Sequence, residues 1–347
     1  MSGCKVMGDS RTSKLTPNNL ACLDAIQTPV AVAYSGGADS TALLLMLARQ
    51  HPGQVQAIHI HHGLQAAADD FAAHCAAFCV VLGVPLHVVY ADAKAHAGQS
   101  PEDAARRARY SALSGKVKDI NSALAQQNLV QAAIKNVAIA QHADDQIETL
   151  LLALSRGAGL PGLSAMPANW QRDGVEFVRP LLGMTTLEIR AYLAEQGLTA
   201  RHPGSANIGL SWVEDPTNLE TQFTRNRIRH DLMPALEKTF PQFRQTFARS
   251  SAHAAEAQSI LVQVAMEDIA RTGNPPRILA LRGLKPERQG NVLRYWLKNT
   301  HQASPSTVQL AELQSQIANC TDRGKQLHIR VASGYVERHG EALAYLP

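Results

Sequence analysis

Four short apolar runs separated by helical stretches constrain the fold of this chain more than any other feature. The runs VAVAY, VQAIHI, PLHVVYA and VAIAQ occupy residues 30–34, 55–60, 85–91 and 137–141. Each is almost continuously apolar, which is typical of parallel strands that are covered on both faces. The stretches between them have helical spacing, so the alternation predicts an α/β domain built on a doubly wound parallel sheet.

Several helices are expected between and after these strands. Ser100, Pro101 and Asp103 combine a cap residue, a first-turn proline and an early carboxylate, which is a helix-start pattern. Thr185 and Glu188 have the spacing of a capping box at the start of a later helix. The segment 115–136 lengthens one crossover, and its weak amphipathic pattern predicts an extra helix rather than a loose loop.

The character of the chain changes near residue 232, where helical patterns replace the alternation. A long helix is expected over 243–272 and shorter ones over 288–299 and 306–319, and the alternating segment KQLHIRVASGYVERHGEALAYL near the end predicts a closing hairpin. We therefore expect three parts. They are a flexible N-terminal tail at 1–24, the α/β domain at 25–225, and a smaller, mostly helical domain with a C-terminal hairpin at 226–347.

Composition excludes several classes of protein. The 347 residues are long enough for two cores, and 45% hydrophobic with 18% charged residues is a globular composition. No apolar run approaches the ~20 residues that cross a bilayer, so we expect no membrane contact. The five cysteines are odd in number and form no CxxC pair, which favours a reducing cytosol. A net charge of +4 permits a polyanionic partner without requiring one.

The string SGGADS at 35–40 follows the first strand and opens a helical run. Adjacent glycines allow a tight turn and close approach to an anion, and the following helix start favours phosphate. A turn that only connects strand to helix is the simpler alternative. The lysine of a Walker loop is missing and the GxGxxG pattern is absent, so backbone groups and hydroxyls would hold the anion. The predicted anion-binding residues here are Ser35, Gly36, Gly37, Ala38, Asp39 and Ser40.

A second polar group, ADDQIET, follows the fourth strand. Asp144 and Asp145 would lie in the first turn of a helix, where a purely structural role is a fair alternative because the helix dipole favours acids there. Ligands of open α/β sheets bind at the carboxyl edge of the strands, which would bring these acids beside the 35–40 string. We assign catalytic roles to Asp39, Asp144 and Asp145, and we expect Asp39 and Asp145 to bind Mg²⁺.

Basic and histidine residues complete the candidate site. TRNRIRH at 224–230 concentrates Arg225 and Arg229 in a short span that could contact RNA phosphates, although a surface helix start is the alternative. Neighbouring residues of a strand point to opposite faces, so the histidines of HIHH at 59–62 are not expected to share one metal. We assign His61 to the nucleotide pocket.

The SGGADS string resembles the PP-loop of the N-type ATP pyrophosphatases, which cleave ATP between its α and β phosphates. Within that superfamily the chain is similar to the tRNA(Ile)-lysidine synthetases over about residues 30–345. The similar segments, in order, are IHIHHGL, PEDAARRARY, AQHADDQIETLLLALSRGAGLPGLSAM, VRPLL, WVEDPTN and TRNRIRHDLMPAL.

This resemblance implies that free lysine is ligated to the wobble cytidine of the CAU anticodon of tRNA(Ile). The cytidine would first be adenylated by ATP with release of pyrophosphate, and lysine would then displace AMP, which changes the specificity from Met to Ile. Further residues near the adenylate or tRNA are implied by the resemblance alone: Glu102, Arg106, Arg109, His142, Glu148, Arg225, Asn226 and Arg229. The resemblance also implies that the residues at 35–40 and His61 bind ATP as a substrate, that the domain at 226–347 binds tRNA, and that Mg²⁺ takes part.

Two departures from the family pattern matter. Many members have a histidine where this chain has Gln141, so only His142 can be matched. The chain also resembles a compact form without the further C-terminal domain of larger members.

Alternative functions are also open. Another PP-loop enzyme such as a tRNA thiolase is one alternative, but its chemistry would require a catalytic cysteine or a CxxC-type cluster. A glutamine-dependent amidotransferase would need a glutaminase domain. A nucleotide-sensing module without turnover is another alternative, and the oligomeric state, a homodimer included, stays open.

Overall fold

The computed structural model describes residues 22–61, 67–91, 101–204, 210–320 and 327–346. The expected N-terminal tail lies almost wholly outside these ranges. The described residues form two compact units: the first includes residues up to 157 and 165–250, and the second includes 158–164 and the residues from 251 onward. No helix within the described ranges is both long and apolar enough to span a bilayer.

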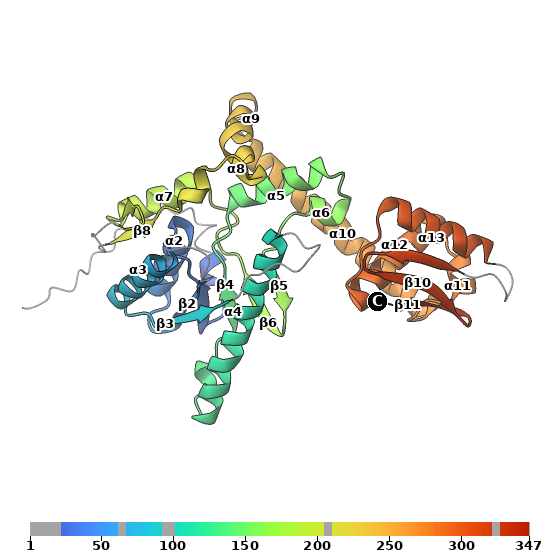
Figure 1. The fold of residues 1–347 in the computed structure, drawn as a ribbon, viewed down its shortest axis with the longest axis horizontal. Helices are drawn as coiled ribbons and strands as arrows, with labels where there is room; N and C mark the ends of the chain where they lie inside the picture. The colour runs from blue at the N-terminus through green and yellow to red at the C-terminus, as the bar shows by residue number, and fades with distance from the viewer. Residues whose placement is uncertain (1–21, 62–66, 92–100, 205–209, 321–326, 347) are drawn as a thin grey trace, which may run out of the picture. The chain divides into compact units, whose positions relative to one another are not determined.

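A six-stranded sheet organises the first unit, with strand order β3-β2-β1-β4-β6-β5 (Figure 1). Its strands are β1 (Val30–Ala33), β2 (Val55–His61), β3 (Leu86–Tyr90), β4 (Asn136–Ala138), β5 (Asn169–Arg172) and β6 (Val175–Val178). Five of them pair in parallel, and β5 pairs antiparallel with β6 at one edge. The four predicted strands and the doubly wound parallel sheet are confirmed, while the β5–β6 hairpin was not predicted.

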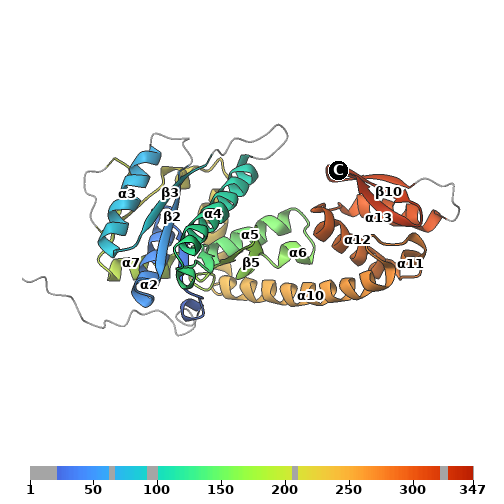
Figure 2. The same ribbon diagram turned by 90° about the horizontal axis from the view of Figure 1, so that it is seen from below.

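Helices cover both faces of this sheet. One apolar cluster joins Val30 and Val32 of β1 to α2 (Ala38–Gln50), α3 (Ala67–Leu82) and α7 (Thr186–Glu195). Ala31 points the other way and belongs to a cluster with α4 (Pro101–Gln126). Figure 2 shows α2, α3 and α7 on one side of β2 and α4 on the other. Burial on both faces explains why the strands are apolar throughout.

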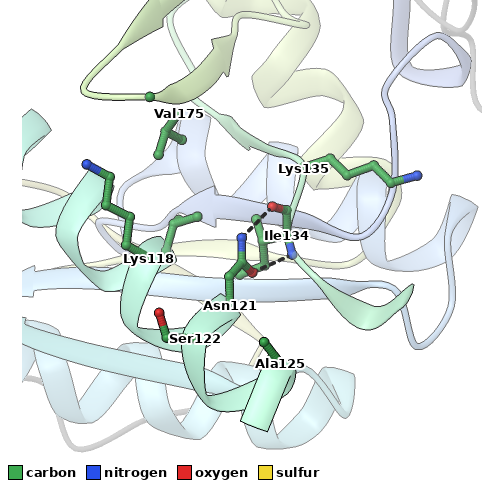
Figure 3. Close-up of a pocket in the computed structure, with 9 residues that line it drawn as sticks. Lys118, Asn121, Ser122, Ala125, Ile134, Lys135 and Val175 are labelled. Carbon is green, nitrogen blue, oxygen red and sulfur yellow. Dashed lines mark hydrogen bonds between the residues drawn. The ribbon is translucent and has the colours of Figure 1, made fainter. Parts of the chain in front are cut away.

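The insertion at 115–136 differs from the expectation of an extra helix. It continues α4 without a break to Gln126 and adds only a 3₁₀ turn at Val130–Ala132. Asn121 accounts for the return to the sheet, because its amide donates to the Ile134 carbonyl at 2.9 Å and accepts from the Ile134 N–H at 2.8 Å (Figure 3). Lys118, Lys135 and neighbouring apolar residues line a hollow of about 350 Å³ beside this contact.

The carboxyl end of the sheet carries the remaining elements of the first unit. These are α5 (Ala143–Ser155), β7 (Thr199–Arg201), β8 (Ser211–Val213), a 3₁₀ turn (Pro216–Leu219), α8 (Thr224–Arg227), a π-helical turn (Ile228–Leu232) and α9 (Met233–Thr239). The Thr185–Glu188 capping box of α7 is confirmed. The small parallel β7–β8 sheet was not predicted from the sequence, because three-residue strands give too short a pattern to recognise.

The second unit is mostly helical. Its elements are α6 (Leu160–Leu163), most of α10 (Phe243–Thr272), α11 (Ile278–Arg282), α12 (Pro286–His301), α13 (Thr307–Asn319), β9 (His328–Val331), β10 (Gly334–His339) and β11 (Ala342–Leu346). Trp296 and Leu313 lie in its core together with Val336. The expected closing hairpin is instead a three-stranded antiparallel sheet in the order β11-β10-β9, since the alternating segment holds three strands rather than two.

Candidate active site

The 35–40 segment forms a tight loop between β1 and α2. Gly36 adopts φ +86°, in the left-handed region, and a Cβ at this position would lie 3.1 Å from the Cys75 sulfur. Gly37 is the N-cap of α2, and no described side chain caps the helix. The first N–H groups of a 13-residue helix therefore remain available to an anion.

Two serines fix the shape of this loop from within. The hydroxyl of Ser40 lies 3.0 Å from that of Ser35 and donates to the Gly37 carbonyl at 3.1 Å. The Ser35 N–H donates to the Ser40 hydroxyl at 3.2 Å. From outside, the Val213 N–H of β8 donates to the Gly36 carbonyl at 2.9 Å. The loop is thus held in a concave shape by groups that leave its helix-side N–H groups available.

A cavity of about 600 Å³ opens beside the loop, within the range of small-molecule sites. Six residues assigned from the sequence contribute to its lining: Ser35, Gly37, Asp39, Ser40, His61 and Arg109. His61 is held by Asp69 at 3.0 Å and by the Tyr90 ring, whose centroid lies 4.8 Å away. The lining also includes His59, Gln141 and Asp215, which the sequence-based assignment missed.

His142 joins the two acids expected to bind metal. Its Nε2 lies 3.5 Å from an Asp39 oxygen and 3.5 Å from an Asp145 oxygen. Burial lowers the pKa of His142, but the hydrogen bond with Asp39 and the charges of Asp145, Asp39 and Asp144 outweigh it and raise the pKa to about 9. The backbone N–H of Asp144 donates to Nδ1 of His142 at 3.2 Å, and this contact favours the neutral ring. The two carboxylates nevertheless have the larger effect on the pKa of His142.

Asp144 itself has little freedom to react. One of its oxygens accepts from the Thr186 N–H at 2.9 Å and the other accepts from Arg244 Nε at 2.6 Å. Burial raises the pKa of this carboxyl, but these hydrogen bonds and the charge of Arg244 lower the pKa by a larger amount. The net shift of the pKa is therefore downward. Asp144 therefore connects α5, the start of α7 and the start of α10.

Glu148 lies fully buried one turn further along α5. Arg229 contacts its Oε1 through Nε at 2.8 Å and through NH2 at 2.7 Å, and Arg225 lies 3.6 Å from its Oε2. Burial raises the pKa of Glu148, although both arginines oppose that shift. The same carboxylate raises the pKa of Arg229, whose NH2 also lies 3.7 Å from Asp145. Acidic and basic side chains thus alternate along a connected series, which consists of Asp39, His142, Asp145, Arg229, Glu148 and Arg225.

Other predicted residues lie apart from this group. The amide of Asn226 donates to the carbonyls of Thr217 and Glu220, both at 2.9 Å, and so holds the turn after β8. Arg106 is exposed with its guanidinium 5.9 Å from the Tyr110 ring centroid. The side chain of Glu102 lies outside the described part of the chain. Asp215 could have been found from the sequence, because WVEDPTN places it in a polar loop after a short apolar run.

Comparison with known proteins identifies the family of this chain. Residues 11–236 match the family described as a PP-loop domain, and residues 277–343 match the TilS substrate binding domain. The curated tRNA(Ile)-lysidine synthase of Polaromonas naphthalenivorans is 54% identical over 317 residues, which cover 91% of this chain and 89% of that protein. This chain belongs to the tRNA(Ile)-lysidine synthase family. The resemblance found in the sequence motifs is therefore confirmed.

A second family member agrees with this assignment, and a solved structure shares the fold. The tRNA(Ile)-lysidine synthase of Pseudomonas putida is 42% identical over 280 residues, and the match covers 77% of this chain but only 59% of that longer protein. A U34-tRNA thiolase from Methanococcus maripaludis has a TM-score of 0.51 at 16% identity, covering 69% of this chain and 77% of that one. At that identity the similarity concerns the fold alone, which is the PP-loop α/β fold.

Proposed function

We propose that this protein ligates free lysine to the wobble cytidine of tRNA(Ile) bearing a CAU anticodon, using ATP and releasing AMP and pyrophosphate. The observation that carries the proposal is the 54% identity to a named tRNA(Ile)-lysidine synthase across nine-tenths of both chains. The anion loop and the neighbouring acids described above supply the chemical groups that this reaction needs.

ATP would bind with its β and γ phosphates on the N–H groups at the start of α2. The loop hydroxyls of Ser35 and Ser40 lie beside this position, and the 600 Å³ cavity has room for the nucleoside. The carbonyl oxygen of the cytosine attacks the α-phosphate, the bond to the β-phosphate breaks, and pyrophosphate leaves with its negative charge on the loop.

Asp39 and Asp145 are the residues that would hold a Mg²⁺ ion that enters with the phosphates of ATP. Asp39 and Asp145 both reach Nε2 of His142, so they lie close enough to face one cation. Within the described ranges no group of three or more acidic, histidine or cysteine side chains could hold a metal alone. Mg²⁺ commonly binds through one or two carboxylates plus substrate phosphates, where it neutralises the charge that develops on the phosphate oxygens.

The second step replaces AMP by lysine. The ε-amine must lose a proton before it attacks the activated ring carbon, and the C–O bond to AMP then breaks. We assign proton acceptance to Asp145, because both oxygens of Asp144 accept hydrogen bonds, whereas in Asp145, among the described residues, only Oδ2 accepts one, from the His142 N–H at 3.0 Å. Arg225 and Arg229 lie beside these acids, where they would contact the phosphates of the anticodon loop. We expect this reaction to take place in the cytosol, where tRNA and ATP meet.

Incubation with ATP, radiolabelled lysine and transcripts of tRNA(Ile) or tRNA(Met), both with CAU anticodons, tests the proposal. Label should enter only the tRNA(Ile) transcript, with one AMP formed for each lysine ligated. A nucleotide-sensing module, the main alternative, would bind ATP without releasing pyrophosphate when tRNA and lysine are added. Absence of label from the tRNA(Ile) transcript would refute the proposed activity.

A further inference from the structure

Gln141 and Arg179 meet at the edge of the sheet where the candidate active site lies. Gln141 follows β4 and Arg179 follows β6, and these strands are parallel neighbours, so residues beyond their carboxyl ends come together. Nε of Arg179 donates to Oε1 of Gln141 at 2.5 Å. Gln141 also lines the 600 Å³ cavity beside Ser35, Asp39 and Ser40.

Arg179 is a fixed donor in this pair. Its side chain is buried, its NH1 donates to the Pro167 carbonyl at 2.6 Å, and its guanidinium lies 3.7 Å from the centroid of the Trp170 ring. Trp170 in turn stacks on Phe177 with a centroid separation of 5.1 Å. The hydrogen bond and the aromatic contacts hold the guanidinium in one place, so Arg179 cannot follow Gln141 if its side chain moves.

This arrangement determines which way the Gln141 amide faces. A guanidinium offers only donors, so the group of Gln141 that faces Arg179 must be the carbonyl oxygen and not the NH2 group. The NH2 group then points away from Arg179, and among the described residues no acceptor contacts it. Gln141 therefore brings an oriented, unused hydrogen-bond donor to a cavity that must receive substrates rich in acceptor oxygens.

We propose that Gln141 contacts the substrate and donates its NH2 group to an oxygen of the bound reactants, and that Arg179 is the residue that positions it. The acceptor belongs either to the phosphates of ATP or to the carbonyl of the target cytosine. Both are oxygen atoms that gain or carry negative charge during adenylation, so a neutral donor beside them stabilises the reacting state. The inference rests on the proposed function for the identity of these substrates.

Two substitutions separate the roles of the amide. Gln141→Leu removes both halves of the amide, whereas Gln141→Glu keeps an acceptor for Arg179 and removes the donor. Both should lower kcat/KM for lysine ligation by roughly ten- to a hundredfold, the range for a hydrogen bond to a charged oxygen. Gln141→Glu should lose at least as much activity as Gln141→Leu, because Arg179 keeps the introduced carboxylate ionised and its charge repels the substrate oxygens. A merely structural role, in which only the contact with Arg179 matters, would instead be preserved by Glu.

Direct measurement of ATP binding without tRNA then locates the acceptor. Weaker binding of ATP by Gln141→Leu assigns the donor to the phosphates, while unchanged ATP binding with a loss confined to the tRNA reaction assigns it to the cytosine. Arg179→Lys should raise KM more than it lowers kcat, because it loosens Gln141 without removing its donor. Thermal unfolding checks that each variant is folded.

A matched control comes from the exposed Gln171 on β5, whose replacement by Glu should leave binding and turnover unchanged. The inference is overturned if folded Gln141→Leu and Gln141→Glu proteins bind ATP and turn over as the unaltered protein does. Failure of the unaltered protein to ligate lysine would instead refute the proposed function. Even in that case the ATP-binding comparison would still test the contact of Gln141 with the phosphates.

Discussion

The backbone N–H of Val213 donates a 2.9 Å hydrogen bond to the carbonyl oxygen of Gly36. This contact joins the anion loop to β8, a short strand that follows much later in the chain. β8 pairs with β7, which carries Arg201, and Arg201 binds Asp70 on α3 through contacts of 2.9 and 2.6 Å. The loop is therefore supported by a series of contacts that runs through β8 and β7 to α3.

Gly36→Ala should impair ATP binding as well as stability. An alanine with φ +86° costs about 1–2 kcal/mol in backbone conformation, and its Cβ would also crowd the Cys75 sulfur at 3.1 Å. We expect a raised Kd for ATP in calorimetric titration and a lower midpoint of urea unfolding. Gly53→Ala is the matched control, because Gly53 has φ +74° with no atom within 4 Å of the added Cβ. It should lose stability but keep its ATP affinity.

Arg201→Met should weaken the support behind the loop. It removes a buried guanidinium from Asp70, and we expect a loss of about 3 kcal/mol in the free energy of unfolding. This is the lower end of the range for a broken buried pair, because Asp70 keeps partial access to water. The KM for ATP should rise, since β7 and β8 carry the Val213 contact to Gly36. An unchanged urea midpoint would show that the pair contributes no stability.

The stability of the metal-free protein should fall in the pH range set by His142. Its pKa of about 9 in the folded state lies above the ordinary 6.5, so the contribution to stability is complete below pH 6.5 and disappears as pH rises through 9. His142→Gln removes this titration. The difference in unfolding free energy between the two proteins, measured in EDTA, should shrink from pH 6.5 to 9.5. A difference that stays constant would mean that His142 does not change charge there.

Arg229 and Glu148 should respond unequally to replacement. Arg229→Met leaves the fully buried Glu148 with only Arg225 at 3.6 Å, so we expect a loss of about 3–5 kcal/mol in unfolding free energy. Adding Glu148→Gln should recover part of that loss, which a double-mutant cycle measures. Arg227→Met is the control, because Arg227 is exposed and contacts only Thr224 within the interactions described. Additive losses from Arg229→Met and Glu148→Gln would contradict the coupling.

Much of this fold was predictable because the physical signal is local. The apolar runs at 30–34 and 55–60 and the capping box of Thr185 are patterns that neighbouring residues create by themselves. The β7–β8 sheet was not predictable, because three-residue strands gain their stability from distant partners such as Gly36. The continuation of α4 past residue 114 was missed for a related reason: Asn121 ends the crossover by binding Ile134, and a polar residue in a helix gives no sign of such a contact.

Some features of the candidate site were likewise predictable from the sequence, and others were not. Motif positions predicted that Asp144 and Asp145 would come to lie beside Asp39, since parallel strands end at one edge of the sheet. The sequence could not reveal that both oxygens of Asp144 are engaged, or that the Asn226 amide holds a turn through the carbonyls of Thr217 and Glu220. Those roles depend on partners such as Arg244 and Thr217 that no spacing rule connects. The roles proposed for the site residues therefore rest on geometry combined with family membership.

The most direct measurement is a crystal structure of the protein with a non-cleavable ATP analogue in which a methylene group joins the α and β phosphates. We predict that the β and γ phosphates lie on the N–H groups of residues 37–40, with the α-phosphate facing Asp39 and the cavity lined by Gln141. Phosphates bound at any other place would contradict the central claim that this lysine-free loop receives the pyrophosphate.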